Sequence, residues 1–191
     1  KQDSELNFSF QGMSDNTFPS LAVWMENVDL LSIAIREGAD INAVYGQNLT
    51  ALYCAVMDGQ EAMVHKLLEY ENCDVNIADL DGITPLMVSI IQGHPRISDM
   101  LLHHNVDVNL TNKLGLNAVA VAAESNEPVI LKALIKKGAT VNNDPEAKKN
   151  ALIFAIEHHN YDMVVDLLKS GAAVNHKNPD NHTPLYFAMD I

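Results

Sequence analysis

The sequence predicts an all-α solenoid in which short helix-turn-helix units stack in one direction and carry short projecting β-hairpins. Two observations predict it. A loop phrase of the Gly-Ala-Asp-Val-Asn type recurs five times, and its closing asparagines lie 34, 33, 33 and 33 residues apart: Asn42, Asn76, Asn109, Asn142 and Asn175. A second phrase begins at residues that are also 33 or 34 apart: Thr17, Thr50, Thr84, Asn117, Asn150 and Thr183. Two phrases that keep one register indicate a repeat array.

The first helix of each unit is expected to begin at the second phrase. Thr50 and Thr84 suit an N-cap, and Pro85 then occupies the first helical position, where its missing N–H is harmless. Asn117 and Asn150 are able to cap in the same way. Apolar residues follow at helical spacing, and one slot on the buried face is always small, as two closely approaching helices require: Ala22, Ala55, Ser89, Ala122, Ala155 and Ala188.

A second helix and a turn complete each unit. The helix carries an apolar face such as Met63, Val64, Leu67 and Leu68. Several of these helices are followed by a glycine suited to a left-handed C-cap: Gly38, Gly138 and Gly171. An Asp-Gly pair at residues 81–82 supplies the tight turn of a hairpin. One such unit cannot bury its apolar face alone, whereas stacked neighbours can.

These phrases divide the chain into units at residues 17–49, 50–83, 84–116, 117–149 and 150–182, with a partial unit at 183–191. Residues 1–16 are either a linker or the tail of a preceding unit, because Asn7–Ser9 lies 33 residues before the loop Asp40–Asn42. An array that stopped after one helix of its last unit would expose an apolar face that a capping unit usually covers. We therefore expect an excerpt from a longer protein.

The units resemble ankyrin repeats. The run Asp-Gly-Ile-Thr-Pro-Leu at Asp81–Leu86, then Gly93-His94, Leu101-Leu102 and Asp107–Asn109, looks like one nearly complete ankyrin unit. The resemblance covers residues 17–191 and implies an ankyrin-repeat α-solenoid that recognises proteins. In the family a histidine ties neighbouring loops, and other residues take its slot here, so we expect weaker ties between units: Tyr53, Met87, Ala120, Ile153 and Tyr186.

Two loops depart from the pattern. The Tyr70–Cys73 loop carries one additional residue, which should make it bulge. The hairpin at Asp144–Lys149 is polar and lacks the turn glycine, so we expect it to be mobile.

Composition restricts the class of partner. The chain has 191 residues, is 48% hydrophobic, and carries 25 acidic against 12 basic residues. Such a surface repels phosphate backbones, so we expect no nucleic-acid partner. The acidity favours solubility or steers a basic partner. No apolar run approaches the roughly 18 residues of a membrane span, and the polar start lacks a secretory core, so we expect a cytoplasmic or nuclear protein without membrane insertion.

The sequence contains no pattern typical of a catalytic or metal site. The histidine pairs at 103–104 and 158–159 point apart on a helix and lack accompanying ligands at zinc spacing. Cys54 belongs to no catalytic phrase, and two cysteines are too few for a disulfide framework. There is no phosphate-binding glycine loop. We expect no enzyme activity and no cofactor in this stretch of chain.

The partner surface is expected on the concave side. The helical wheel places two residues of each first helix opposite the buried face: Trp24 and Met25, Met57 and Asp58, Ile91 and Gln92, Glu124 and Ser125, Glu157 and His158. The ankyrin resemblance implies that these residues and the hairpin tips bind partners, the tips offering Tyr45, Leu80, Ile83, Leu114 and Leu116. The face is apolar in three units and acidic in the next two. It would suit an amphipathic or extended segment with apolar anchors and basic residues.

Structural roles for the same residues stay open. Trp24 is also suited to filling the end of the core against residues 1–16, Met57 and Ile91 to packing under hairpins, and Glu124 and Glu157 to ordinary solvated positions. In function, an adaptor or targeting segment competes with the regulatory arm of a larger enzyme or channel. The resemblance further implies that Asn76 and Asn109 are substrates of an oxygen-sensing asparaginyl hydroxylase, although both also suit ordinary hairpin positions.

Overall fold

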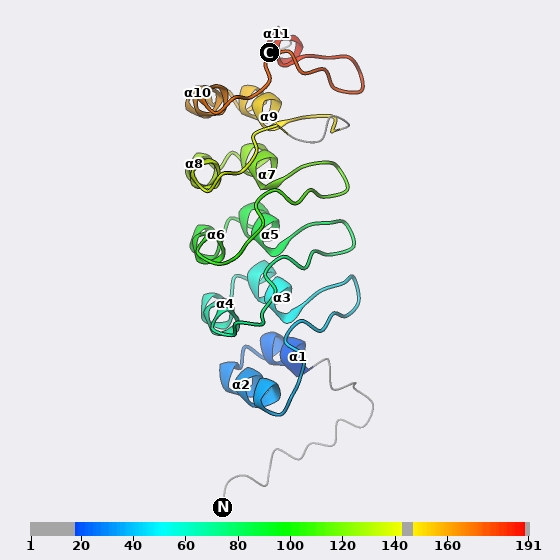
Figure 1. Cartoon of the computed structure of the whole chain (residues 1–191), viewed down its shortest axis with the longest axis vertical. Helices are drawn as coiled ribbons and strands as arrows, with labels where there is room; N and C mark the ends of the chain where they lie inside the picture. The colour runs from blue at the N-terminus through cyan, green and yellow to red at the C-terminus, as the bar shows by residue number, and fades with distance from the viewer. Residues whose placement is uncertain (1–17, 143–146, 190–191) are drawn as a thin grey trace, which may run out of the picture.

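The computed structural model describes residues 18–142 and 147–189. In these ranges the chain forms eleven helices, of which the first ten make five pairs (Figure 1). Their bounds are α1 Phe18–Trp24, α2 Val28–Arg36, α3 Ala51–Met57, α4 Glu61–Leu68, α5 Pro85–Ile91, α6 Pro95–Leu102, α7 Ala118–Glu124, α8 Pro128–Lys136, α9 Ala151–Glu157, α10 Tyr161–Lys169 and α11 Pro184–Met189.

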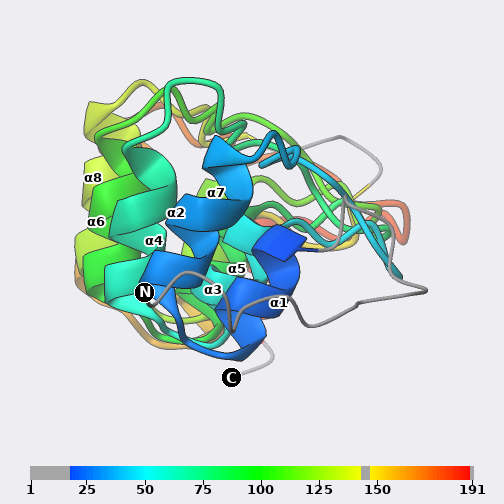
Figure 2. The same ribbon diagram turned by 90° about the horizontal axis from the view of Figure 1, so that it is seen from below.

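The helices lie in two layers. The odd-numbered helices, here called the inner helices, each pack on the next inner helix, and the even-numbered outer helices also pack on one another. Seen along the array, both layers lie on one side and the loops between pairs project to the other (Figure 2). The small slot of the inner helices lies between the two layers and is fully buried in Ala22, Ala55, Ser89, Ala122 and Ala155. In α11 the prediction fails, because Ala188 is exposed. The serine is satisfied because its hydroxyl lies 2.8 Å from the Ser98 hydroxyl of the paired helix.

Four of the predicted N-caps and three predicted C-cap glycines are confirmed. The inner helices α3, α5, α7 and α9 begin after a residue whose side chain accepts a hydrogen bond from the backbone N–H three positions on, as N-capping requires: Thr50, Thr84, Asn117 and Asn150. The predicted C-cap glycines, Gly38, Gly138 and Gly171, have φ of 95°, 90° and 89°. Such angles favour glycine, so these positions end the outer helices.

The recurring asparagines tie the loops of successive pairs. Asn42 donates from Nδ2 to the carbonyl of Asn72 (2.7 Å) and accepts at Oδ1 from the N–H of Asp74 (2.8 Å). Asn76 and Asn142 make the same two bonds to the next loop, and Asn109 accepts from Thr140. We expected weak ties between units because the family histidine is missing. The asparagine bonds link successive loops without that histidine. Even the histidine slot contributes once, since the Tyr53 hydroxyl donates to Asp79 at 2.7 Å.

The projecting segments are hairpin-like turns closed by backbone bonds such as that from the N–H of Asp79 to the carbonyl of Ile83, and they do not lengthen into strands in the described residues. Their one β-pairing is an isolated bridge between Tyr45 and Leu49. Side chains satisfy the amides at the turn ends: Asp79 Oδ1 accepts from two backbone N–H groups of its turn, and Asn112 Oδ1 does the same. The N–H of Ile83 and that of Leu116 thus bond a side chain in place of the reciprocal backbone carbonyl that a β-bridge would need. The expectations for residues 1–16 and for residues 143–146 of the fourth turn lie outside the described residues.

Candidate partner-binding face

Five inner helices end in residues that occupy equivalent positions. These last residues, here called the ladder, are Trp24, Met57, Ile91, Glu124 and Glu157. Trp24 is 80% exposed, Met57 39% and Ile91 51%. Glu124 is also exposed, and Glu157 is half-buried. Because the repeat keeps its register, the ladder follows the length of the array, with three apolar side chains followed by two carboxylates.

The residues that follow the ladder are mostly open to solvent. Met25, Asp58 and Gln92 are exposed, as the helical wheel predicts, whereas Ser125 is half-buried. His158 is exposed but has a structural contact, because its Nε2 lies 2.7 Å from the carbonyl oxygen of Glu124 in the preceding pair. This bond helps to hold α7 and α9 in register.

The turns carry a second row of apolar side chains, here called the tips. Tyr45, Leu80 and Leu114 are exposed at 38%, 53% and 70%, and they come from successive loops. Ile83 is half-buried and packs against the core. Leu116 corrects the sequence interpretation. It is only 5% exposed, because its N–H donates to Asn112 as the turn closes and its side chain joins the core.

Tyr45 is held in place by a neighbouring thiol. Its hydroxyl lies 2.8 Å from Cys54 Sγ, which anchors the first tip to α3. Burial raises the pKa of the Tyr45 hydroxyl, with the thiol contact adding to the effect, and burial likewise raises the pKa of the Cys54 thiol. Burial also raises the pKa of the Cys73 thiol to about 12. Both thiols are therefore protonated at neutral pH and are poor nucleophiles.

The acidic end of the ladder is less negative than the sequence suggests. Lys149 Nζ lies 2.7 Å from a carboxylate oxygen of Glu157, so this pair is largely neutral. In the described part of the chain, no ion pair reaches Glu124. Its exposed carboxylate is the charge on the ladder that remains for a partner.

A pocket beside Glu124 was missed by the sequence interpretation. It has a volume of about 460 Å³ and lies between the third and fourth projecting loops, lined by Leu114, Leu116, Phe154, Glu124 and three lysines, Lys113, Lys148 and Lys149. One signal in the sequence could have indicated it. Phe154 is a large aromatic residue in a slot that holds Cys54, Val88 and Val121 in α3, α5 and α7.

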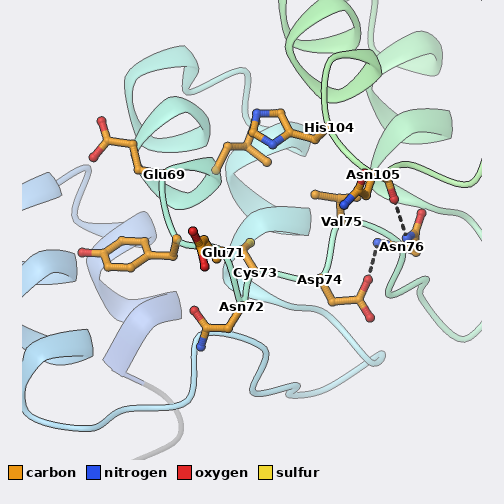
Figure 3. Close-up of a pocket in the computed structure, with 11 residues that line it drawn as sticks. Glu69, Glu71, Asn72, Cys73, Asp74, Val75, Asn76, His104 and Asn105 are labelled. Atoms are coloured by element: carbon orange, nitrogen blue, oxygen red, sulfur yellow. Dashed lines mark hydrogen bonds between the residues drawn. The ribbon is translucent and has the colours of Figure 1, made fainter.

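The longer loop Tyr70–Cys73 forms another pocket, of about 630 Å³ (Figure 3). Its additional residue is accommodated by a turn in which the N–H of Cys73 donates to the carbonyl of Tyr70 at 3.0 Å. Asn76 lines the pocket, but its side chain already bonds to Asn105. Among residues 18–142 and 147–189, no cluster of His, Cys, Asp or Glu could hold a metal ion.

Comparisons with known proteins agree on the family. The model of the family described as ankyrin repeats (3 copies) matches residues 20–112 and again 100–178. A segment of 78 residues, 40% of this chain, is 36% identical to part of the potassium channel AKT3 of Oryza sativa subsp. japonica and covers 8% of that protein. Another of 77 residues, 39% of this chain, is 38% identical to an ankyrin repeat protein of Rickettsia felis and covers 19% of it.

The chain thus spans less than a fifth of the length of these relatives. No helix in the described residues is long and apolar enough to cross a membrane. Ankyrin repeats generally mediate protein–protein interactions. The stacked helix pairs and the two matched ranges together show that this chain belongs to the ankyrin repeat family.

Proposed function

We propose that this chain is a cytoplasmic adaptor or targeting segment that binds a partner protein through its inner face, made of the ladder and the tips. The observation that carries the proposal is the apolar run in equivalent exposed positions, Trp24, Met57 and Ile91. Isolated exposed apolar residues are common on any protein. A run that recurs once per helix pair and lies beside a second row, the tips, makes a contiguous patch of the kind that partners cover.

Three features support a specific partner. Trp24 and Tyr45 are aromatic, and aromatic residues usually carry much of the binding energy in protein interfaces. The pocket beside Glu124 offers an apolar floor with charged groups at its rim, which would fix the register of a bound segment. The acidic balance of the chain favours a basic partner segment.

A second candidate function has its own supporting observation. One relative is a potassium channel, and the match covers 8% of it. Under this alternative the present chain is the regulatory arm of a larger channel or enzyme, and its inner face binds another segment of the same polypeptide. The sequence on either side of residues 1–191 in the natural protein discriminates between the two functions.

Site-specific photo-crosslinking tests the proposed face. Benzoylphenylalanine would replace Ile91 on the ladder or, as a matched control, Val129 on α8, which is 73% exposed on an outer helix. In the native full-length protein in cells, we expect the Ile91 position to give a defined crosslinked product and the Val129 position to give none. A defined product from Val129 alone would place binding on the outer helices and contradict the proposal.

A further inference from the structure

We infer that the segment bound by the inner face is an amphipathic α-helix lying along the ladder. Its apolar residues recur at the first position of each heptad, facing Trp24, Met57 and Ile91, and at the fourth position, facing the tips. One heptad further on, a Lys or Arg faces Glu124. This inference rests on the proposed function and specifies the conformation and chemistry of the partner.

The step of the array matches a heptad. Consecutive inner helices α1, α3, α5 and α7 pack directly on one another. Packed helices lie about 8–10 Å apart. Seven residues of an α-helix advance about 10.5 Å. Three residues of an extended polyproline II segment advance about 9 Å and bring a side chain back to the same face, so spacing alone allows either conformation.

The backbone of this face favours the helix. At the tips, the N–H of Leu80 donates to the carbonyl of Gln47 (3.1 Å), and the N–H of Lys113 donates to the carbonyl of Asp81 (2.9 Å). Successive tips therefore use these backbone groups on one another. They are not open to pair with an added strand.

Backbone groups beside the ladder are also already bonded. The carbonyl of Val23 accepts from Gln60 Nε2 at 3.1 Å, and that of Glu124 is bonded to His158. An extended segment on this face would bury its own N–H and C=O groups with few partners, which is unfavourable for each group left unpaired. An α-helix satisfies those groups internally and presents only side chains. An apolar ladder whose neighbouring backbone groups are already bonded fits such a helix.

Charge fixes where the apolar contacts end. Trp24, Met57 and Ile91 would each contact one apolar residue of the bound segment. The next ladder residue is Glu124, whose carboxylate is exposed. Glu157 is already paired with Lys149, so a second basic residue would gain less there. The segment is therefore about 22 residues long, since four contacts at a spacing of seven span three heptads.

Two labelled synthetic peptides of equal length and composition test the inference on the 191-residue protein. The heptad peptide has Leu at the first and fourth positions of three heptads and Lys one heptad further on. The triplet peptide places the same Leu residues at every third position, with its remaining residues arranged to disfavour a helix. We expect the heptad peptide to bind at least about 10-fold more tightly by fluorescence anisotropy. We also expect it to gain helical circular dichroism on binding.

Variants assign the binding to the ladder. Ile91→Asp should weaken the heptad peptide by about 10-fold or more, whereas Val129→Asp on the outer helix α8 should leave it unchanged. Trp24→Asp gives a second ladder variant if Ile91→Asp lowers the melting temperature. Glu124→Lys should weaken the heptad peptide more than Glu157→Lys does.

The remaining outcomes separate the inference from the proposed function. If the triplet peptide binds more tightly and loses affinity in Ile91→Asp, the partner is extended and the helix inference is overturned while the inner face stands. If neither peptide responds to Ile91→Asp or Trp24→Asp, the inference and the proposed face both fail.

Discussion

The first three inner helices end in Trp24, Met57 and Ile91, whereas the next two end in Glu124 and Glu157, although all five hold the same position in their pairs. On the opposite side of the same helices, the slot that meets the outer layer stays small and fully buried throughout. Packing constrains one side of the helix and leaves the other free to vary. The contrast teaches that packing of the array fixes one set of positions in the repeat and leaves another set exposed and variable.

The ladder has an apolar region, Trp24, Met57 and Ile91, and a polar region, Glu124 and Glu157. The two regions also differ in whether neighbouring side chains pair with their exposed groups. The apolar region leaves its side chains open, and Trp24 is 80% exposed. In the polar region Lys149 neutralises Glu157 and leaves Glu124 as the available charge. If this division between an apolar and a polar region governs binding, substitutions in the two regions should differ in kind and in size of effect.

The largest expected effect is on stability. Leu101 is fully buried in α6, whose neighbours α4 and α8 flank it in the outer layer. Leu101→Ala should lower the free energy of unfolding by about 2–5 kcal/mol, through lost burial and a cavity. Ile91→Ala on the ladder should change it by less than about 0.5 kcal/mol, because that side chain is half-exposed. Urea melts of both variants check the contrast. A loss below about 1 kcal/mol for Leu101→Ala would mean that this site is not core.

The aromatic anchors of the apolar region come next. Trp24→Ala and Tyr45→Ala should each weaken partner binding by about 2 kcal/mol or more, measured by calorimetry with the crosslinked partner. Tyr45→Phe is the matched control, since it keeps the ring and loses only the bond to Cys54. Binding that is lost equally in Tyr45→Phe and Tyr45→Ala would assign the effect to that bond and its support of the turn.

A smaller effect is expected where the two regions join. Outer helix α6 lacks a C-cap glycine, and Lys137 Nζ from the next loop donates to the carbonyls of Leu102 and His104 instead. A cation near a helix C-terminus is typically favourable. Lys137→Met should therefore cost about 1 kcal/mol in a urea melt. The neighbouring Lys136→Met should cost less, and equal losses for both would assign no capping role to Lys137.

The charges of the polar region should affect the rate of association with the partner. Glu124→Lys should slow association with a basic partner and reduce its dependence on salt, because steering acts through exposed charge. Glu157→Lys should act in the same direction but more weakly, since Lys149 already compensates that carboxylate. Stopped-flow association at several ionic strengths measures both. A larger effect for Glu157→Lys would show that the ion pair does not persist in solution.

Modification of Asn76 and Asn109 stays a prediction. Both belong to the asparagine series that ties successive loops, and Asn76 bonds Asn105 and Asp107. Mass spectrometry of protein from oxygenated animal cells should find a single-oxygen increase on one or both residues. Unmodified peptides for both positions would leave them with their structural role alone.

Much of the fold could be predicted because the same local signals recur in each repeat unit. The N-caps Thr50, Thr84, Asn117 and Asn150, the C-cap glycines and the small buried slot all follow from local chemistry at a fixed spacing. The turns could not be predicted as well. Whether a turn closes in a β-bridge depends on which side chain bonds its amides, as Asp79 does.

The site was predicted only in outline. Helical geometry identifies Trp24 and Ile91 as outward-facing, but it does not tell that Leu116 turns into the core. The pairing of Glu157 with Lys149 joins side chains eight residues apart, and the pocket that includes Phe154 spans two successive loops. Such contacts depend on the relative placement of loops, which no local pattern specifies.

The most direct test compares the inner and outer faces with one partner. Tyr45→Ala combined with Ile91→Ala removes a tip and a ladder residue, whereas Lys132→Glu, Lys136→Glu and Asp166→Lys change the outer helices α8 and α10. Affinity for the crosslinked partner should fall by about 100-fold in the inner double variant and stay within about 2-fold in the outer variants. Melting temperatures verify that each variant is folded. Binding that survives the inner double variant and is lost on changing Lys132, Lys136 or Asp166 would contradict the account and place recognition on the outer helices.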